Sequence, residues 1–517
     1  MKNILLIQTD QMRFDCLGAN GNPYVKTPNL DRLAGEGANF TRHIVANPIC
    51  MPSRASFFTG LYPPAHNVWN NGVPLNRLKY MPHDSGFYAD KSLNGQTHRA
   101  LVEPATMAEI FQENGYQTCM FGKLHLTPHS APAEYAFEES EAFWESEQSA
   151  GFDGPYYGFE KVEFAISHGD RPVFKGGTYS QYMKAEHPDL YDRCLRNAGG
   201  KKGPIPQVPD LYASDVPERY HTSAWVADRF IDYCDRVRDQ GKPFFAYIGF
   251  PDPHHPFTPS YDVVENFENS EVQKWYCEHE RIAKNSPFAQ YLYDTEAGAN
   301  QVTDLTDEEK KKIVQYTYAM IYQVDVAVGR ILDYLENNGM SENTVVVFTS
   351  DHGDFLCDND LLRKSFIPAP QLLHVPFIIR DPRNEVFRGK IDTPMSNCDV
   401  LPTLLGAAGI EYARASFHGR DIAEVIHAGE ENFPLAYVYN FKEPTLHSYT
   451  ICDRQYRLSW YPVIGVYELY DSLNDPNESE NLYDELKDEA FVTRLQDILK
   501  QKIPLHTNPI LAKPCGW

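Results

Sequence analysis

The 517-residue chain contains no hydrophobic run that approaches the roughly 20 apolar residues of a transmembrane helix. Its ten cysteines are scattered and form no C-x-x-C pair, which excludes zinc-finger spacing and predicts mostly reduced, buried thiols. Basic residues are few, because 47 Lys and Arg stand against 71 Asp and Glu, for a net charge of −24. This balance argues against nucleic-acid or anionic-membrane partners, but a local group of cations can still bind a small anionic substrate.

The opening residues do not resemble a secretory signal. The apolar run from Ile4 to Ile7 is too short for one and ends at Asp10, so we expect the chain as given to be cytoplasmic. Hydrophobic residues at 42% and charged residues at 23% are typical of a globular protein. The length predicts one large domain and a smaller one.

Short apolar runs alternate with amphipathic segments along most of the chain. Strands are predicted at 3–8, 117–121, 243–249, 344–350 and 375–380, and helices at 28–36, 107–114, 222–239 and 306–338. This alternation predicts the α/β class, with a mostly parallel sheet flanked by helices. Ligands of such sheets bind beyond the carboxyl ends of strands, where Asp10, Asp351 and the turn after Gly249 lie.

Two regions depart from this alternation. Residues 128–220 are rich in Gly, Tyr, Glu and Pro and are predicted to form an insertion that shapes the substrate pocket. Strand-like runs at 435–439, 449–453 and 466–470, followed by a helix at 489–500, predict a small C-terminal antiparallel sheet plus helix. We therefore expect a main α/β domain over 1–430 and a small α+β domain over 431–517.

The segment from Cys50 to Gly60, CMPSRASFFTG, carries the strongest chemical signal. A cysteine at a helix start has a lowered pKa, although many such thiols are inert. Asp10 and Asp351, with Gln11 and His352 beside them, offer oxygen ligands and one imidazole to a divalent cation. Each aspartate alone could be a helix cap or a surface charge. Because both follow apolar strands and flank the Cys50 segment in sequence, we favour a metal site.

These segments resemble the sulfatase family of the alkaline-phosphatase-like superfamily. C-x-P-S-R followed by T-G is its signature, and further matching blocks occur in the family's order: NILLIQTDQ, TPNLDRLAGEGANF, GKLHL at 122–126, DPHHPF at 252–257, SDHGDFLCDNDLLRKS at 350–365 and ELYDSLNDPNESENLYD at 468–484. The resemblance covers nearly the whole chain and implies an alkaline-phosphatase-like fold.

The resemblance also implies a chemistry. A formylglycine-generating or anaerobic maturation enzyme would oxidise Cys50 to formylglycine, whose hydrated aldehyde is the nucleophile. One divalent metal is implied, with Ca²⁺ favoured and Mn²⁺ or Mg²⁺ as alternatives. Its implied ligands are Asp10, Gln11, Asp351, His352 and residue 50.

Other polar residues in the matching blocks have implied roles as well. Arg54, Lys123 and Lys364 would place cations around the sulfuryl oxygens. His125 and His254 are candidate proton carriers. Four other histidines have less support as functional residues: His66, His129, His168 and His255. Of these, His168 in the insertion is a candidate for substrate contact.

Two departures from the family pattern keep alternatives open. Gln11 stands where most sulfatases have a second acidic residue, which is similar to phosphonate monoester hydrolases and choline sulfatases. Cys357 and Asn359 stand in a stretch that is usually Gly-Asp-His.

The favoured function is hydrolysis of a sulfated sugar or a small alkyl or aryl sulfate. The alternatives are a phosphonate monoester hydrolase or phosphodiesterase, and a non-catalytic sulfated-glycan binder. Retention of every polar element argues against the binder, and the sequence does not indicate an oligomeric state.

Overall fold

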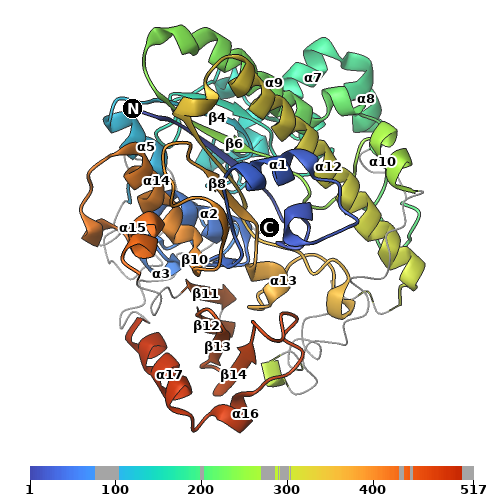
Figure 1. The fold of residues 1–517 in the computed structure, drawn as a ribbon. Coiled ribbons are helices and arrows are strands. Elements are labelled where there is room, and N and C mark those ends of the chain that lie inside the picture. Colours follow the sequence, from blue (N-terminus) through green and yellow to red (C-terminus); the bar gives the residue numbers. More distant parts are fainter. Residues whose placement is uncertain are drawn as a thin grey trace.

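An eight-stranded sheet with helices on both faces forms the body of the computed structural model (Figure 1). The structure describes residues 1–75, 104–197, 203–268, 286–288, 290, 302, 304–429, 436–442 and 446–502. The strand order is β5-β4-β6-β1-β7-β8-β2-β9. The strands are β1 (Asn3–Thr9), β2 (Ala38–Phe40), β4 (Gln117–Gly122), β5 (Lys161–Phe164), β6 (Phe244–Gly249), β7 (Thr344–Ser350), β8 (Phe377–Arg380) and β9 (Gly389–Ile391).

The sheet is mostly parallel, as the sequence predicts. Every neighbouring pair from β5 to β7 is parallel, whereas β8 runs antiparallel to both β7 and β2. The predicted strand at 375–380 starts two residues later than expected, at Phe377. The other predicted strands of this sheet agree with the observed bounds to within one residue.

Strand β1 shows why the sheet needs a helical layer on each face. Leu5 and Ile7 join one buried apolar cluster, and Ile4 and Leu6 join another on the opposite face. The first cluster packs under α1 (Pro28–Glu36), α9 (Thr222–Val237) and α12 (Asp307–Asn337). The second packs under α2 (Cys50–Thr59), α5 (Met107–Glu113) and α14 (Val400–Ala408). A strand buried on both faces reads as a continuous apolar run, which is the pattern of residues 4–7.

The predicted helices lie where expected, but one cap differs. Helix α1 begins at Pro28 and stops at Gly37, as predicted. The Thr27 hydroxyl does not cap it; instead, it accepts a hydrogen bond from the Gly18 backbone N–H at 2.9 Å and donates to Asp31 at 3.1 Å. Further helices are α3 (Pro63–His66), α6 (Glu141–Trp144), α7 (Gly177–Glu186), α8 (Pro188–Asn197), α10 (Tyr261–Glu268), α13 (Pro370–Leu373) and α15 (Ile422–His427).

The predicted insertion at 128–220 does more than cover the sheet. It contains α6, α7 and α8, and its strand β5 extends the main sheet by pairing parallel with β4. Val162 and Phe164 of β5 are buried. The strand has only four residues, so the alternation of Lys161 and Glu163 with those apolar side chains is too short to identify it in the sequence.

The C-terminal part is a four-stranded antiparallel sheet with helices. Its strands are β11 (Ala436–Lys442), β12 (Leu446–Cys452), β13 (Tyr456–Tyr461) and β14 (Val466–Asp471), and its helices are α16 (Tyr483–Leu486) and α17 (Ala490–Lys502). Strand β13 was not predicted from the sequence. Leu458 and Leu469 share a buried cluster with Trp69 and Val73, which follow α2, so this sheet packs against the main body. Residue 430, the predicted boundary, lies outside the described residues.

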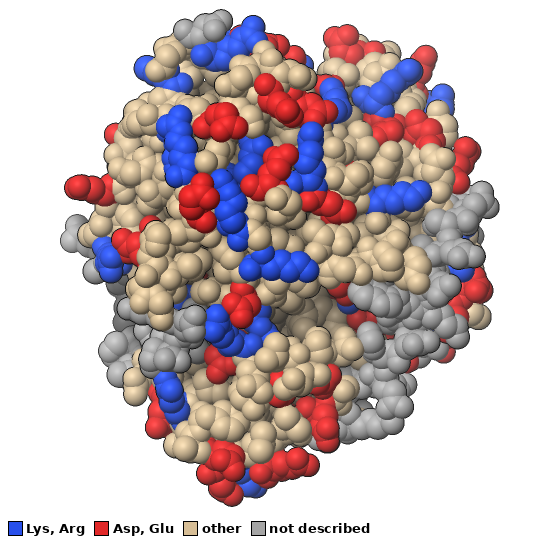
Figure 2. All heavy atoms as spheres, viewed as in Figure 1, with Lys and Arg blue, Asp and Glu red and all other residues tan. Residues whose placement is uncertain are grey.

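Short strands β3 (His43–Ile44) and β10 (Met395–Ser396) form a separate parallel pair. In the described part of the chain, no helix combines the length and apolarity needed to cross a membrane. On the face shown in Figure 2, basic and acidic side chains are interspersed and do not gather into one basic patch.

Candidate active site

Asp10 and Asp351 lie next to each other at the carboxyl ends of two neighbouring strands. Strands β1 and β7 pair in parallel with Thr9 opposite Ser350, so the residues that follow each strand meet at the same edge of the sheet. Both aspartates are fully buried. The backbone N–H groups of Gln11 and His352 donate to Asp351 Oδ1 at 3.1 Å and 2.9 Å. The structure thus brings the two predicted carboxylates together in one fixed place.

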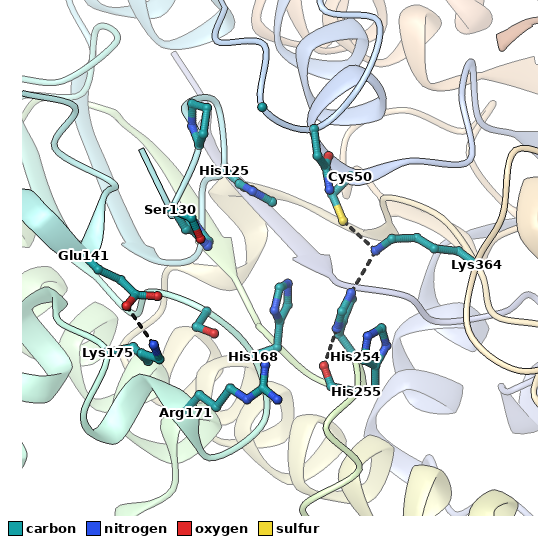
Figure 3. Close-up of a pocket in the computed structure, with 15 residues that line it drawn as sticks. Cys50, His125, Ser130, Glu141, His168, Arg171, Lys175, His254, His255 and Lys364 are labelled. Atoms are coloured by element: carbon teal, nitrogen blue, oxygen red, sulfur yellow. Dashed lines mark hydrogen bonds and ion pairs between the residues drawn. The ribbon is translucent and has the colours of Figure 1, made fainter. Parts of the chain in front are cut away.

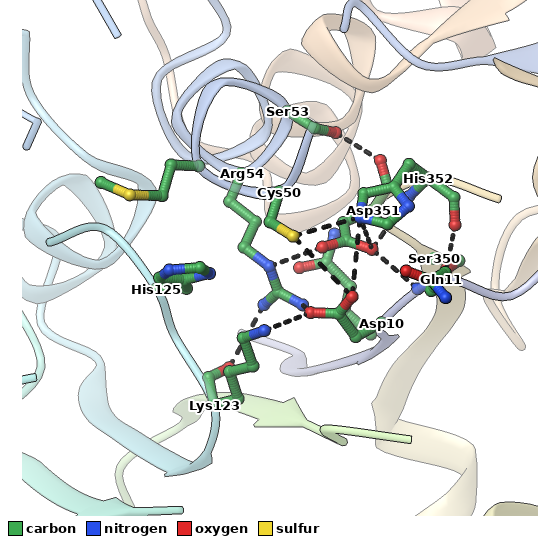
Figure 4. A network of polar contacts seen from close by, with 12 residues as sticks. Asp10, Gln11, Cys50, Ser53, Arg54, Lys123, His125, Ser350, Asp351 and His352 are labelled. Atoms are coloured by element: carbon green, nitrogen blue, oxygen red, sulfur yellow. Dashed lines mark hydrogen bonds and ion pairs between the residues drawn. The ribbon is translucent and has the colours of Figure 1, made fainter. Parts of the chain in front are cut away.

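Helix α2 presents Cys50 to these carboxylates (Figure 4). The helix begins at Cys50 and all ten of its residues are buried. The Ser53 hydroxyl donates to the backbone carbonyl of Asp351 at 2.5 Å, and the Asn397 amide donates to the backbone carbonyl of Ser53 at 2.9 Å. These bonds hold the helix against the end of β7 and so fix its first residue, Cys50, beside the two carboxylates.

Two buried cations balance the two carboxylates (Figure 4). Arg54 donates from Nε to Asp351 at 2.8 Å and from Nη2 to Asp10 at 3.1 Å, and Lys123 Nζ donates to Asp10 at 2.5 Å. Burial acts to raise the pKa of Asp10, but Lys123 and Arg54 outweigh it and hold the pKa well below its usual range. Asp10 is therefore ionised, and the network carries fixed charges in a water-poor place.

The Cys50 sulfur is surrounded by polar groups. Lys364 Nζ donates to it at 2.8 Å, His352 Nε2 lies 3.2 Å away, and Asp10 Oδ1 lies 3.9 Å away. Burial and Asp10 act to raise the pKa of Cys50, yet Lys364, His352 and Lys123 outweigh them and lower it. This is the environment of a nucleophile and not of an inert core thiol.

The orientation of His352 follows from one backbone contact. Its Nδ1 lies 2.8 Å from the carbonyl oxygen of Gly353, which assigns the proton to Nδ1 because a carbonyl can only accept. Burial acts to lower the pKa of His352, but Asp351 and Cys50 outweigh it and raise the pKa. In the neutral form of the ring Nε2 carries the lone pair, and it faces Cys50 and Asp10, the latter at 3.6 Å. A ring fixed in this way is typical of a metal-ligating histidine.

A cavity of about 370 Å³ opens onto Cys50 (Figure 3). Three other predicted residues line it: His125, His254 and Lys364. Lys364 Nζ lies 2.8 Å from His254 Nε2, so the lysine spans Cys50 and this histidine. Burial lowers the pKa of His254 well below its usual range, with further contributions from His168 and Lys364. The imidazole is neutral and can exchange a proton at the cavity wall.

His125 lies on the opposite wall of the cavity (Figure 3). Its φ of 59° is in the left-handed region, and Glu139 accepts a hydrogen bond from its backbone N–H. The ring stacks on His129 with centroids 4.1 Å apart, and Nδ1 has no hydrogen-bond partner among the described residues. Burial, with His129 and Lys123, lowers the pKa of His125 well below its usual range, so it can act as a proton acceptor.

His168, which had less support in the sequence, enters the site directly. Its Nε2 contacts Lys123 Nζ, and its ring stacks on His254 with centroids 3.6 Å apart. Since an ammonium can only donate, His168 accepts this hydrogen bond as a neutral ring. It comes from the insertion, far from any of the matching sequence blocks, so no local pattern pointed to it. His129 and His255 also line the cavity, whereas His66 bonds Ser56 within the helix layer at 2.9 Å.

Replacement of His168 is expected to disturb Lys123 and His254 together. His168→Ala should lower kcat/KM by about 10- to 100-fold, as is typical when a group that orients a reacting residue is lost. His168→Gln keeps a hydrogen-bond acceptor and should recover more activity than His168→Phe, which keeps only an aromatic ring. Steady-state kinetics of the three variants check this, and equal losses in Gln and Phe would contradict the acceptor role.

Gln11 is placed differently from the other predicted ligands. Its φ is 71°, and its Nε2 donates to Asp354 at 2.5 Å and lies 3.3 Å from His255 Nδ1. Its Oε1 is buried and has no hydrogen-bond partner among the described residues. A buried carbonyl oxygen that accepts no hydrogen bond from these residues is a candidate cation ligand. The amide nitrogen, meanwhile, is held by its hydrogen bond to the Asp354 carboxylate.

Carboxylates, buried cations and an activated thiol at the strand ends of a mostly parallel sheet define a hydrolase of the alkaline-phosphatase-like class. The comparisons with known proteins agree. The profile described as "Sulfatase" matches residues 2–410, and the one described as "N-sulphoglucosamine sulphohydrolase, C-terminal" matches residues 361–504. The chain therefore belongs to the sulfatase family and is a sulfuric ester hydrolase.

Individual relatives extend over most of the chain. An arylsulfatase of Clostridium perfringens is 28% identical over 97% of this chain and 94% of its own length. The multifunctional alkaline phosphatase superfamily protein PehA of Trinickia caryophylli is 28% identical over 86% of this chain and 81% of its own. Among solved structures, the phosphonate monoester hydrolase of Agrobacterium radiobacter matches with a TM-score of 0.71 and 22% identity, covering 97% of this chain and 95% of that one. The last match supports the fold.

Proposed function

We propose that this chain hydrolyses a sulfate monoester with residue 50, matured from cysteine to formylglycine, as the nucleophile. The observation that carries the proposal is the place of Cys50. Cys50 lines the cavity, and its sulfur lies within hydrogen-bonding distance of Lys364 and His352. The sulfatase family generally uses formylglycine, and its hydrated aldehyde supplies a hydroxyl nucleophile at this position.

A divalent metal fits the residues beside Cys50. One ligand atom from each of four residues lies within 4.8 Å of all the others: Asp10, Cys50, Asp351 and His352. Gln11 Oε1 adds a buried oxygen without a hydrogen-bond partner among the described residues. Oxygen-rich ligation favours a hard cation, and we propose Ca²⁺, with Mn²⁺ or Mg²⁺ as alternatives because of the imidazole. The metal supplies a Lewis acid that lowers the pKa of a bound hydroxyl.

The chain's own residues have separable tasks in the proposed reaction. Lys364 and His254 lie on the substrate side of Cys50, where they bind the sulfate oxygens. The Lys364 ammonium, next to the neutral His254, supplies the proton to the leaving oxygen, which departs as the alcohol. His125, on the opposite wall, removes a proton from residue 50 after sulfate transfer. Arg54 and Lys123 hold the carboxylates of Asp10 and Asp351 in place.

We propose a sulfated sugar or a small alkyl or aryl sulfate as substrate, and a formylglycine-generating or anaerobic maturation enzyme as a partner. We also propose that residues 1–430 form a catalytic domain and residues 431–517 a small second domain.

The second candidate function is that of a phosphonate monoester hydrolase or phosphodiesterase. It is favoured by the neutral Gln11 beside Asp10, which leaves the site less negative than two acidic residues would.

The mass of the Cys50 peptide tests the proposal. Conversion of the thiol to an aldehyde lowers the mass of that peptide, whereas ordinary thiol oxidation raises it. We expect the lowered mass in protein produced with a maturation enzyme, together with turnover of 4-nitrophenyl sulfate. Unmodified Cys50 in a protein that still hydrolyses sulfate would overturn the formylglycine mechanism. A higher kcat/KM for phenylphosphonate esters than for the sulfate would instead support the second candidate.

A further inference from the structure

The cavity in front of Cys50 has a polar lining. The described residues that line it include no Phe, Tyr, Trp, Leu, Ile, Val or Met. Five of them are histidines, and the outer wall adds Ser130, Glu141, Arg171 and Lys175 (Figure 3). Binding sites for apolar alcohols are lined mainly by hydrophobic and aromatic side chains. A hydroxylated alcohol, able to exchange hydrogen bonds with such walls, fits this cavity better than an aryl, steroid or lipid group.

The cations of the cavity differ in what they contact. Lys364 donates to Cys50, and Lys175 donates to Glu141 at 2.8 Å. Arg171 makes no hydrogen bond or ion pair from its guanidinium to any described residue, and its exposed side chain lines the cavity, with the guanidinium near the base of His168 in Figure 3. Because Glu141 and Lys175 balance each other, the outer wall carries one uncompensated positive charge, at Arg171.

The backbone that carries Arg171 is firmly held. Arg171 begins the short 3₁₀ turn η6 (Arg171–Val173), whose other two residues are buried. The preceding Asp170 is buried, and its carboxylate accepts hydrogen bonds from Tyr212 at 3.0 Å and Ser214 at 3.3 Å. An arginine on a fixed turn loses less freedom when it binds an anion, and its planar group suits a carboxylate or a sulfate.

We propose that Arg171 is a specificity residue that binds a second anionic group, a carboxylate or a further sulfate, on a hydroxylated alcohol whose sulfate ester faces residue 50. The inference rests on the proposed sulfatase function and adds the class of alcohol to it. The guanidinium does not discriminate between a carboxylate and a sulfate, because each of them can accept two parallel hydrogen bonds from it.

The test uses three probes that differ only at carbon 6 of the sugar. These are methyl galactoside sulfate, the same compound with a second sulfate at carbon 6, and methyl galacturonoside sulfate. Each is prepared as the 2-, 3- and 4-sulfate, and 4-nitrophenyl sulfate serves as the reference substrate. The readout is the ratio of kcat/KM for each acidic probe to that for its neutral counterpart, so a general loss of activity cancels.

Three variants accompany the wild-type enzyme. Arg171→Met removes the charge, and Arg171→Lys keeps the charge but loses the planar pair of donors. Arg193→Met is the matched control, because Arg193 is an exposed arginine of the same segment, on α8, and does not line the cavity. We expect the wild-type enzyme to favour an acidic probe by about 10-fold or more, which corresponds to one charge-assisted contact.

Arg171→Met should bring this ratio close to one, Arg171→Lys should give an intermediate value, and Arg193→Met should leave it unchanged. A preference that is carried by the carboxylate probe alone, or by the disulfated probe alone, identifies which anion is bound. No acidic preference in the wild-type enzyme, or a preference that survives in Arg171→Met, would show that Arg171 is only a solvated surface cation.

The outcomes also separate this inference from the proposed function. Turnover of 4-nitrophenyl sulfate without turnover of any sugar sulfate leaves the sulfatase proposal standing and overturns the inference. Failure of the matured enzyme to hydrolyse 4-nitrophenyl sulfate and every sugar probe overturns both.

Discussion

Cys50→Ala is expected to lose turnover by at least about 10⁴-fold while the protein folds normally, since removal of a catalytic nucleophile commonly has an effect of this size. The change deletes only a sulfur that contacts polar groups, and the backbone of α2 is held through Ser53 and Asn397. The melting temperature should therefore change little. The measurement is kcat/KM for 4-nitrophenyl sulfate together with thermal unfolding of the same samples.

Cys234→Ala is the control for this variant. Cys234 is fully buried on α9 within the apolar cluster, and burial raises the pKa of its thiol. The control should lose some stability and keep its activity, the reverse of Cys50→Ala. Wild-type-like rates in Cys50→Ala would end the proposal that residue 50 is the nucleophile.

Asp10→Asn is expected to abolish both turnover and the stabilisation of the protein by added divalent metal. Asp10 neutralises Lys123 and Arg54, and its other oxygen faces Cys50 and His352. Loss of one member of a buried charge network costs about 3 kcal/mol of folding stability, so the variant should also melt earlier. A metal present at about 100 times its Kd adds roughly 2.7 kcal/mol to the wild-type protein, and this increment should be absent in the variant.

Asp381→Asn provides the matched comparison. Asp381 is also fully buried, and it pairs with Lys2 at 2.6 Å at the opposite end of the strands. Its replacement should lower the melting temperature but preserve the rise on adding Ca²⁺, Mn²⁺ or Mg²⁺ after chelation. A normal metal-dependent rise in Asp10→Asn would contradict the assignment of Asp10 as a ligand.

Features encoded in neighbouring residues were predictable from the sequence. Apolar runs such as Ile4–Ile7 identified buried strands, and Asp10 and Asp351 stood out because each follows such a run. Proline, glycine and amphipathic spacing placed most helix bounds within two residues. Strands β5 and β13 were missed because they mix polar and apolar residues even at buried positions, such as Glu163 in β5 and Arg457 in β13. Their pairing depends on neighbouring strands and not on the pattern within each segment.

By itself, the sequence determined the class of fold, the family and the chemical groups available, because strand periodicity, helix caps and the C-x-P-S-R segment are local properties of the chain. Only the tertiary structure decided which groups meet. Lys364 reaches Cys50 across 314 residues, His168 stacks on His254, Gln11 turns its amide nitrogen to Asp354, and Arg171 lines the cavity. These contacts depend on the order of strands in the sheet and on loops that leave different strands, and no local spacing encodes either.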